Sequence, residues 1–281
     1  MRLRDRLPNY LRTEDITDYE GYADYVIFKE GADTKAMNGN TGIIESTNTN
    51  SRTVIQYAIN ALLATGGKIF IRRGAYSIAT ALTINQSDLE IIMQKGAIIT
   101  TTAAVNAIEI GATLNANNCI ISGGELAGAT TGLTGIYIVS MTRSTIRNME
   151  ISNFTEWGID SQYNHSIFIT ECFVHNNGTS ATAPYSGGIV VGHHNGGDTN
   201  CNAVRISRCT IETNITGVWI VHAQGTTVTD CVIENQVKHG LAIDRQGAGG
   251  AAVSTYIRSH FEANNSSSTA TTYDIFISGT A

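Results

Sequence analysis

The sequence predicts an all-β fold, a parallel β-helix in which each repeat forms one coil of a solenoid. Four successive segments between Ser144 and Gln246 align with one another, and their anchors are 22 or 23 residues apart where nothing is inserted (149 to 172, 209 to 231). Apolar residues recur three residues before and two residues after each anchor, and a glycine opens a second short strand in every segment. Repeats of this kind are typical of β-solenoids. The aligned anchors are Met149, Cys172, Cys209 and Cys231.

Equivalent residues of neighbouring coils are expected to stack about 4.8 Å apart, because one coil cannot bury its own inward face. The cysteines of the chain number 5, an odd count, and three of them fall in the inward ladder. Cys172, Cys209 and Cys231 are therefore predicted to be buried, unoxidised thiols. A column of turn residues is expected to hydrogen-bond from coil to coil, and it comprises Asn153, Asn176, Thr213 and Asn235. Small, polar, Gly-rich insertions are predicted loops, at 178–186, 194–202 and 246–252.

The start of the chain does not repeat. Residues 1–50 are predicted to be an N-terminal extension, either an attachment segment or a strap packed along the solenoid, and 51–281 to be the β-helix domain. Residues 53–65 carry apolar side chains at helical spacing, with Thr53 and Gln56 in a capping-box relation. This α-helix is expected to close the open apolar end of the first coil. The following strands are expected to make about nine coils over 68–280.

The composition suits one large domain, with 281 residues of which 42% are apolar and only 15% charged. A net charge of −6 argues against nucleic acid as a partner. The first residues lack the apolar stretch of a signal peptide, and no run is long enough for a membrane span. No ligand pattern is diagnostic of a metal site, so neither a metal nor another cofactor is expected.

The segment "GGKIFIRRGAYSI" at 66–78, which follows the predicted helix and precedes the coils, resembles the first coil of the pectate-lyase-like superfamily of right-handed β-helix proteins. Arg72 and Arg73 stand where that pattern has another residue and a proline. The resemblance covers roughly residues 26–280 and implies a right-handed solenoid. Its members include pectate lyases, polygalacturonases, epimerases, phage tailspike depolymerases and non-catalytic surface proteins. The segment "YVIFKEG" also resembles the lead-in of archaeal β-helix surface proteins.

The catalytic signatures of these families are mostly missing. The sequence has neither the Asp-Asp pair and Arg-x-Lys of polygalacturonases nor the Asp-Pro-His-Glu of alginate epimerases. His239-Gly240 resembles the His-Gly element of polygalacturonases, but this glycine already opens a repeat strand. No loop offers the carboxylate cluster with which pectate lyases bind calcium. The reaction, if there is one, must be argued from other residues.

The first candidate site is the outward column that lies three residues after the anchors. It comprises His175, Glu212 and Glu234, which we take as candidate catalytic residues. Carboxylates on neighbouring coils have Cα atoms about 4.8 Å apart, close to the separation of the carboxyl groups in retaining glycosidases. The alternative is a solvated ladder in which the two glutamates turn away from each other.

A second outward column lies five residues after each repeat glycine. It predicts substrate-binding residues, since tyrosine, histidine and arginine side chains bind hydroxylated or anionic sugars. The alternative is that these strand-end residues hydrogen-bond to the loops. The candidates are Tyr163, His193, His222 and Arg245, with the adjacent Asp244.

A third outward column is unusually apolar for a solvent face. Its residues are Tyr137, Asp160, Val190, Trp219, Ala242 and Phe276. One interpretation is that a loop or the N-terminal strap covers it. If it is exposed, it is a platform for sugars or a subunit contact, since the β-helix tailspikes that the chain resembles are trimers. Trp219 is the first choice for a sugar contact, because the chain has only 2 tryptophans.

These observations predict a polysaccharide-recognising β-helix protein of a virion or cell surface, which is an extracellular location. The expected partner is a polysaccharide or cell-surface glycan, and a homotrimer is one assembly that the resemblance implies. Catalysis is left open. The alternatives are a glycan-degrading enzyme, either a hydrolase or a lyase of the tailspike depolymerase kind, and a purely structural or adhesive surface protein.

Overall fold

The computed structural model of the chain describes residues 23–179, 186–192, 201–221, 223–245, 255–264 and 273–279. These residues form two sheets and one helix, α1 (Ser51–Ala61). The smaller sheet has eight strands: β6 (Leu82–Ile84), β8 (Ile108–Ile110), β11 (Thr134–Ile138), β14 (Trp157–Ser161), β17 (Gly187–Val191), β21 (Thr216–Val221), β24 (His239–Arg245) and β26 (Ile275–Gly279).

The larger sheet has 18 strands within the described part of the chain. They are β1 (Tyr25–Glu30), β2 (Asp33–Asn38), β3 (Ile44–Asn48), β4 (Gly67–Ile71), β5 (Gly74–Ile78), β7 (Leu89–Thr101), β9 (Ala116–Asn117), β10 (Ile120–Ala127), β12 (Met141–Arg147), β13 (Glu150–Ser152), β15 (Asn164–Thr170), β16 (Phe173–His175), β18 (Cys201–Asn202), β19 (Arg205–Ser207), β20 (Thr210–Glu212), β22 (Ala223–Gln224), β23 (Thr226–Glu234) and β25 (Thr255–Glu262).

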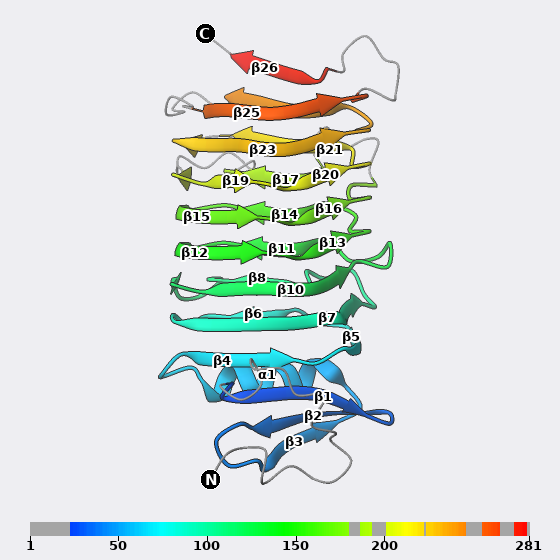
Figure 1. Ribbon diagram of the computed structural model, residues 1–281, viewed down its shortest axis with the longest axis vertical. Coiled ribbons are helices and arrows are strands. Elements are labelled where there is room, and N and C mark those ends of the chain that lie inside the picture. Colours follow the sequence, from blue (N-terminus) through cyan, green and yellow to red (C-terminus); the bar gives the residue numbers. More distant parts are fainter. Residues whose placement is uncertain are drawn as a thin grey trace.

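The strands of successive coils stack in parallel along the long axis of the molecule (Figure 1). Ile159 of β14 pairs with Ile189 of β17, which in turn pairs with Val218 of β21, so each inward column runs on from coil to coil. The predicted parallel β-helix is confirmed. It has about seven turns rather than the nine expected.

The interior is a continuous ladder of isoleucine, valine and cysteine side chains. Cys172, Cys209 and Cys231 are free and at most 2% exposed, so the prediction of buried, unoxidised thiols is confirmed. The hydrogen bond between the Cys172 and Cys209 thiols, together with burial, raises the pKa of Cys209 to about 12. A thiol with this pKa is not a reactive nucleophile near neutral pH.

The predicted ladder of turn residues lies one position later than expected. Asn176 has a φ of 54° and makes the left-handed turn itself, as its counterparts in the neighbouring coils do. The hydrogen-bonded ladder is formed by the next residues, the buried side chains of Asn177, Asn214, Gln236 and Asn264. Asn214 accepts a hydrogen bond from the backbone N–H of Asn177 (3.0 Å) and donates to the backbone carbonyl of Val174 (3.1 Å). An amide fits here because it satisfies buried backbone donors and acceptors at once.

The described part of the N-terminal segment adds strands to the end of the solenoid. β1 pairs antiparallel with β2 and parallel with β4, and β2 pairs antiparallel with β3. Residues 23–48 therefore lie at the N-terminal end and do not run along the coils as a strap (Figure 1). Residues 1–22 lie outside the described part, and the domain boundary near residue 50 stays a prediction.

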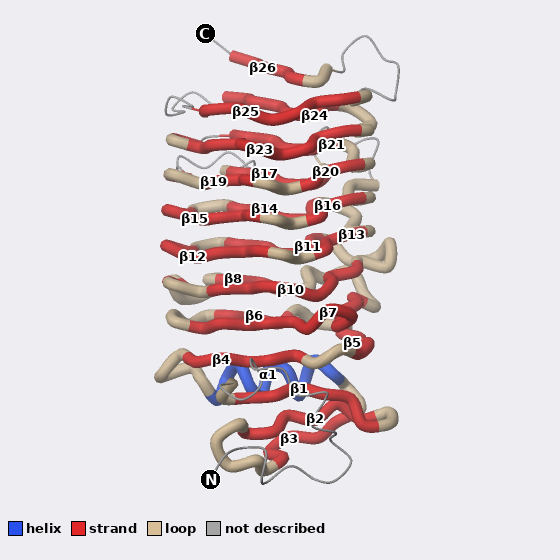
Figure 2. The backbone as a smooth tube through the Cα atoms, viewed as in Figure 1, coloured by secondary structure: helices blue, strands red, loops and turns tan. Residues whose placement is uncertain are grey.

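Helix α1 lies at the same end of the molecule (Figure 2). It begins after Asn50, whose side chain accepts a hydrogen bond from the backbone N–H of Arg52 (3.0 Å), so the predicted Thr53–Gln56 capping box is wrong. Gln56 instead hydrogen-bonds the backbone of Thr83, which ties the helix to β6. The apolar face of α1 is part of the main core, through Val54, Ile55, Ala58 and Ile59.

Candidate functional site

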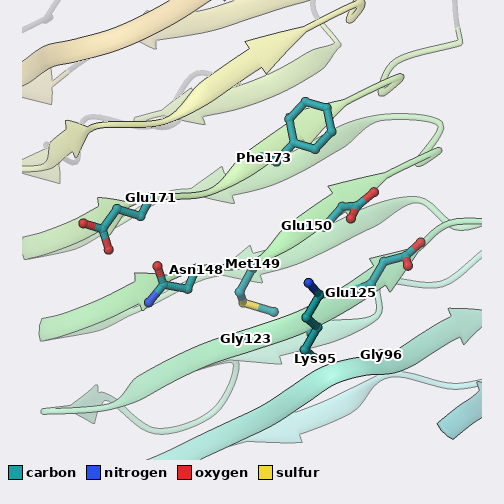
Figure 3. Close-up of a pocket in the computed structure, with 10 residues that line it drawn as sticks. Lys95, Gly96, Gly123, Glu125, Asn148, Met149, Glu150, Glu171 and Phe173 are labelled. Atoms are coloured by element: carbon teal, nitrogen blue, oxygen red, sulfur yellow. The ribbon is translucent and has the colours of Figure 1, made fainter. Parts of the chain in front are cut away.

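A pocket with a volume of about 740 Å³ opens on the outer surface of the larger sheet (Figure 3). It lies at the bend where each coil passes from a longer strand, such as β12, to a shorter one, such as β13. Carboxylate, amine, amide and aromatic side chains meet there. The lining residues are Lys95, Gly96, Gly123, Gly124, Glu125, Asn148, Met149, Glu150, Glu171 and Phe173.

The floor of the pocket is shaped by a glycine pair within β10. Gly123 and Gly124 have φ values of 75° and 61°, and the register against β7 shifts between Gly123 and Glu125. A Cβ atom on Gly123 would lie 2.1 Å from the carbonyl oxygen of Met93, so only glycine permits this approach. In the next coils the same bend is made by single left-handed residues, Asn148 (φ 54°) and Glu171 (φ 56°).

Glu125 and Glu150 stand side by side on neighbouring coils. Glu125 of β10 pairs in register with Glu150 of β13, and Glu150 pairs with Phe173 of β16. The in-register Cα atoms of parallel strands are about 4.8 Å apart. Figure 3 shows the carboxylates of Glu125 and Glu150 directed the same way, with Lys95 next to Glu125.

The surroundings of these two carboxyl groups differ. Partial burial and the nearby charge of Glu150 raise the pKa of Glu125, although His175 acts in the opposite direction. The Nε2 atom of His175 lies 3.1 Å from Oε1 of Glu150. The ring of His175 is held in place by stacking on Phe173, at 4.1 Å between centroids, and by Asn176, whose Nδ2 is 2.8 Å from its Nδ1. Of the two carboxyl groups, Glu125 is thus the one whose pKa is raised, and Glu150 is the one with a histidine partner.

The predicted column of His175, Glu212 and Glu234 is in register, since His175 pairs with Glu212 and Glu212 with Glu234. The column continues to Glu262 of β25. However, the ring of His175 contacts Glu150 on the preceding coil, and neither Glu212 nor Glu234 lines the pocket. The catalytic role of Glu212 and Glu234 stays a prediction.

The second predicted column is only partly described. Tyr163 is half-buried beyond the end of β14, and Asp244 is buried on β24. Arg245 is the last residue of β24. His193 and His222 lie outside the described residues, so the role of this column as a substrate-binding row stays a prediction.

The third predicted column is in register from Tyr137 to Phe276, but it is not exposed. Trp219 is fully buried and stacks on Trp157, with 6.0 Å between ring centroids and 18° between planes. Together with Val190, Val221 and Ala242 the two tryptophans form a second apolar cluster on the outer side of the smaller sheet. The prediction of Trp219 as an exposed sugar contact is therefore wrong.

Sequence reasoning missed Glu125 and identified Glu150 only as part of an aligned segment. Both residues follow the anchor position of their coil, where Gly124 takes the place of Met149. Extending the alignment by one coil toward the N-terminus would have paired them. Within the described residues, no group of three or more His, Cys, Asp or Glu side chains is arranged to hold a metal ion.

Residues 79–255 match the family profile described as "Right handed beta helix region". The chain belongs to this family. The structure of Geobacillus virus E2 ORF18 is similar, with 12% identity, a TM-score of 0.55, and coverage of 80% of this chain and 58% of that one. The Dettilon tailspike protein (gp208) is similar with 16% identity, a TM-score of 0.57, and coverage of 79% of this chain and 44% of that one. These likenesses show the right-handed β-helix fold.

This right-handed β-helix chain thus spans about half the length of these two proteins that it matches in structure. No curated protein sequence matches it. Among the described residues, α1 is too short and too polar to cross a membrane.

Proposed function

We propose that this protein is a polysaccharide-recognising β-helix protein of a virion or cell surface, and that the glycan binds in the pocket around Glu125, Glu150 and Phe173. The observation that carries this proposal is the pocket itself, which brings two in-register carboxylates, an aromatic ring and Lys95 together on a rigid solenoid. Carboxylates and amines hydrogen-bond sugar hydroxyls, and an aromatic ring packs against the apolar face of a sugar. The shared fold with a tailspike motivates the virion or surface location.

Two further predictions from the sequence are kept as proposals beside this pocket. Tyr163, His193, His222, Asp244 and Arg245 are retained as a proposed second row of sugar contacts. A homotrimer is retained as the proposed assembly.

The unequal carboxyl groups favour a second candidate function, hydrolysis of a glycosidic bond. Glu125 would give its proton to the glycosidic oxygen while the bond from that oxygen to the anomeric carbon breaks. Glu150 would form a bond to the anomeric carbon. Carboxyl groups on adjacent strands are close together, as the two carboxyl groups of retaining glycosidases are. Water would then break this bond, delivering its hydroxyl to the sugar and its proton to Glu125. The stacked pair Glu212 and Glu234 is the alternative site for the same chemistry.

Replacing Phe173 with alanine is expected to weaken polysaccharide binding about tenfold, since the pocket loses its aromatic wall. The matched control is Val232→Ala, because Val232 occupies the same outward column two coils further on and is 37% exposed. Isothermal titration calorimetry with soluble acidic and neutral polysaccharides measures both variants. Equal affinities for Phe173→Ala and the unmodified protein would contradict the pocket as the binding site.

A further inference from the structure

Adjacent outer faces of the solenoid carry opposite charge. The longer strands and the bends that follow them, over 141–148, 164–171, 201–208, 223–230 and 255–258, carry five arginines and two carboxylates, all exposed. The shorter strands of the same coils carry four glutamates and no lysine or arginine, over 150–152, 173–175, 210–212, 232–234 and 260–262. The surface formed by the longer strands and their bends, called here the arginine face, is thus positive in a chain with a net charge of −6. Its arginines are Arg143, Arg147, Arg205, Arg208 and Arg258.

Arg205 differs from Arg208 and Arg258 in its partner. Arg208 pairs with Glu171 (2.9 Å) and Arg258 pairs with Asp230 (2.8 Å). Arg205 instead lies over the ring of Phe168, at 5.2 Å from its centroid, and forms no ion pair with the described part of the chain. A guanidinium stacked on an aromatic ring is held in orientation and keeps its N–H donors free for an anion.

Hydroxyl groups and a second aromatic ring surround Arg205. Thr170, Ser207 and Thr229 stand in one register row beside it, and the Ser207 hydroxyl lies 3.2 Å from that of Thr170. Arg205 pairs with Thr227, which pairs with Tyr256, and the side chain of Tyr256 is 59% exposed. A fixed guanidinium, a row of hydroxyls and an exposed ring together match a sugar that carries an acidic group.

The arginine face borders the pocket. Arg147 directly precedes Asn148 and Met149, which line the pocket, and Glu171, the partner of Arg208, also lines it. A glycan chain that lies in the pocket can therefore extend over the arginine face without leaving the larger sheet.

We infer that the glycan is acidic, and that its carboxylate or sulfate groups bind Arg205 where it stacks on Phe168. This inference rests on the proposed function and names its substrate class. The charged group of the sugar takes the two parallel N–H donors of the guanidinium, its neighbouring hydroxyls bond to the hydroxyl row, and the next sugars reach Tyr256.

The test compares three probes by isothermal titration calorimetry: polygalacturonate, which carries carboxylates, dextran sulfate, which carries sulfates, and neutral dextran. At least one acidic probe is expected to bind and neutral dextran to bind at least tenfold more weakly. Arg205→Gln is expected to weaken binding of the acidic probe about tenfold. Arg258→Gln removes the same charge from an arginine already paired with Asp230, and its affinity is expected to stay within about twofold. Arg205→Lys keeps the charge but loses the planar fork, so an intermediate affinity is expected.

The outcomes separate this inference from the proposed function. Neutral dextran that binds best and depends on Phe173 would overturn the acidic substrate class while leaving the pocket in place. Equal losses in Arg205→Gln and Arg258→Gln would show attraction to net charge alone and overturn the assignment of Arg205. Binding of an acidic probe that depends on Arg205 but not on Phe173 would overturn the pocket and retain the arginine face. Binding of none of the probes would overturn both.

Discussion

Replacing Glu125 with glutamine is expected to lower the rate of glycan cleavage at least a hundredfold, on any polysaccharide that the unmodified protein cleaves. Glutamine keeps the shape of the side chain but has no acidic proton to give to the leaving oxygen, and a general acid typically contributes about 10²- to 10⁴-fold. Binding in the pocket should survive, because the amide still hydrogen-bonds hydroxyls. Release of reducing ends measures the rate, and calorimetry measures the binding.

Glu212→Gln and Glu234→Gln are the matched controls. These residues also stand in register on neighbouring coils, but they do not line the pocket, so their variants are expected to keep the rate. If these two variants cleave the glycan more slowly and Glu125→Gln cleaves it at the unmodified rate, the catalytic site is instead the predicted column of His175, Glu212 and Glu234. If all three keep it, the row containing His193, His222 and Arg245 is the one to test.

Replacing Asp160 with asparagine is expected to stabilise the fold at pH 8 and to change its stability little at pH 4. Burial raises the pKa of Asp160 from 3.8 to about 7, Gln162 opposes this through a hydrogen bond, and Glu156 adds to it. The raised pKa means that the folded state favours the protonated carboxyl. The stability that the protonated carboxyl of Asp160 contributes to the fold is therefore fully present below about pH 4 and is lost as the pH rises through about 7.

The gap between 3.8 and about 7 corresponds to at most about 4 kcal/mol in the free energy of unfolding. Asparagine keeps the acceptor for Gln162, whose Nε2 lies 3.2 Å from the carboxylate, and has no charge to bury. Urea unfolding at pH 4, 6 and 8 measures the effect, with Glu156→Gln as a control that removes an exposed charge nearby. Parallel pH profiles for the unmodified protein and Asp160→Asn would contradict the burial of an ionisable Asp160.

The fold could be predicted because every coil has the same inward positions to fill with apolar side chains. Ile146, Ile169, Ile206 and Val228 recur at one offset since each must fill the same inward position on the coil below. The hydrogen-bonding amides were harder to place. Asn176 and Asn177 are both asparagine, and only the backbone shows which of them takes the left-handed φ and which turns inward.

The candidate site was harder to predict than the coils. Glu125 follows a Gly123–Gly124 bulge, which puts a glycine at the anchor position, so the column that joins it to Glu150 emerges only when the alignment is extended by one coil toward the N-terminus. His175 was identified from its column, but its ring direction toward Glu150 depends on stacking with Phe173. The predicted exposure of Trp219 was wrong for a related reason. The alternation of the strand shows that this residue points out of the coil, but it does not show whether a separate apolar cluster buries it.

The most direct test of the central claim is a crystal structure of the protein with an oligosaccharide cut from a polysaccharide that it binds. The predicted result is a sugar packed on Phe173 with hydroxyls bonded to Glu125 and Glu150, and with the chain extending toward Arg205. A sugar bound along Glu212 and Glu234, or on the smaller sheet, with the pocket left empty, would contradict the account.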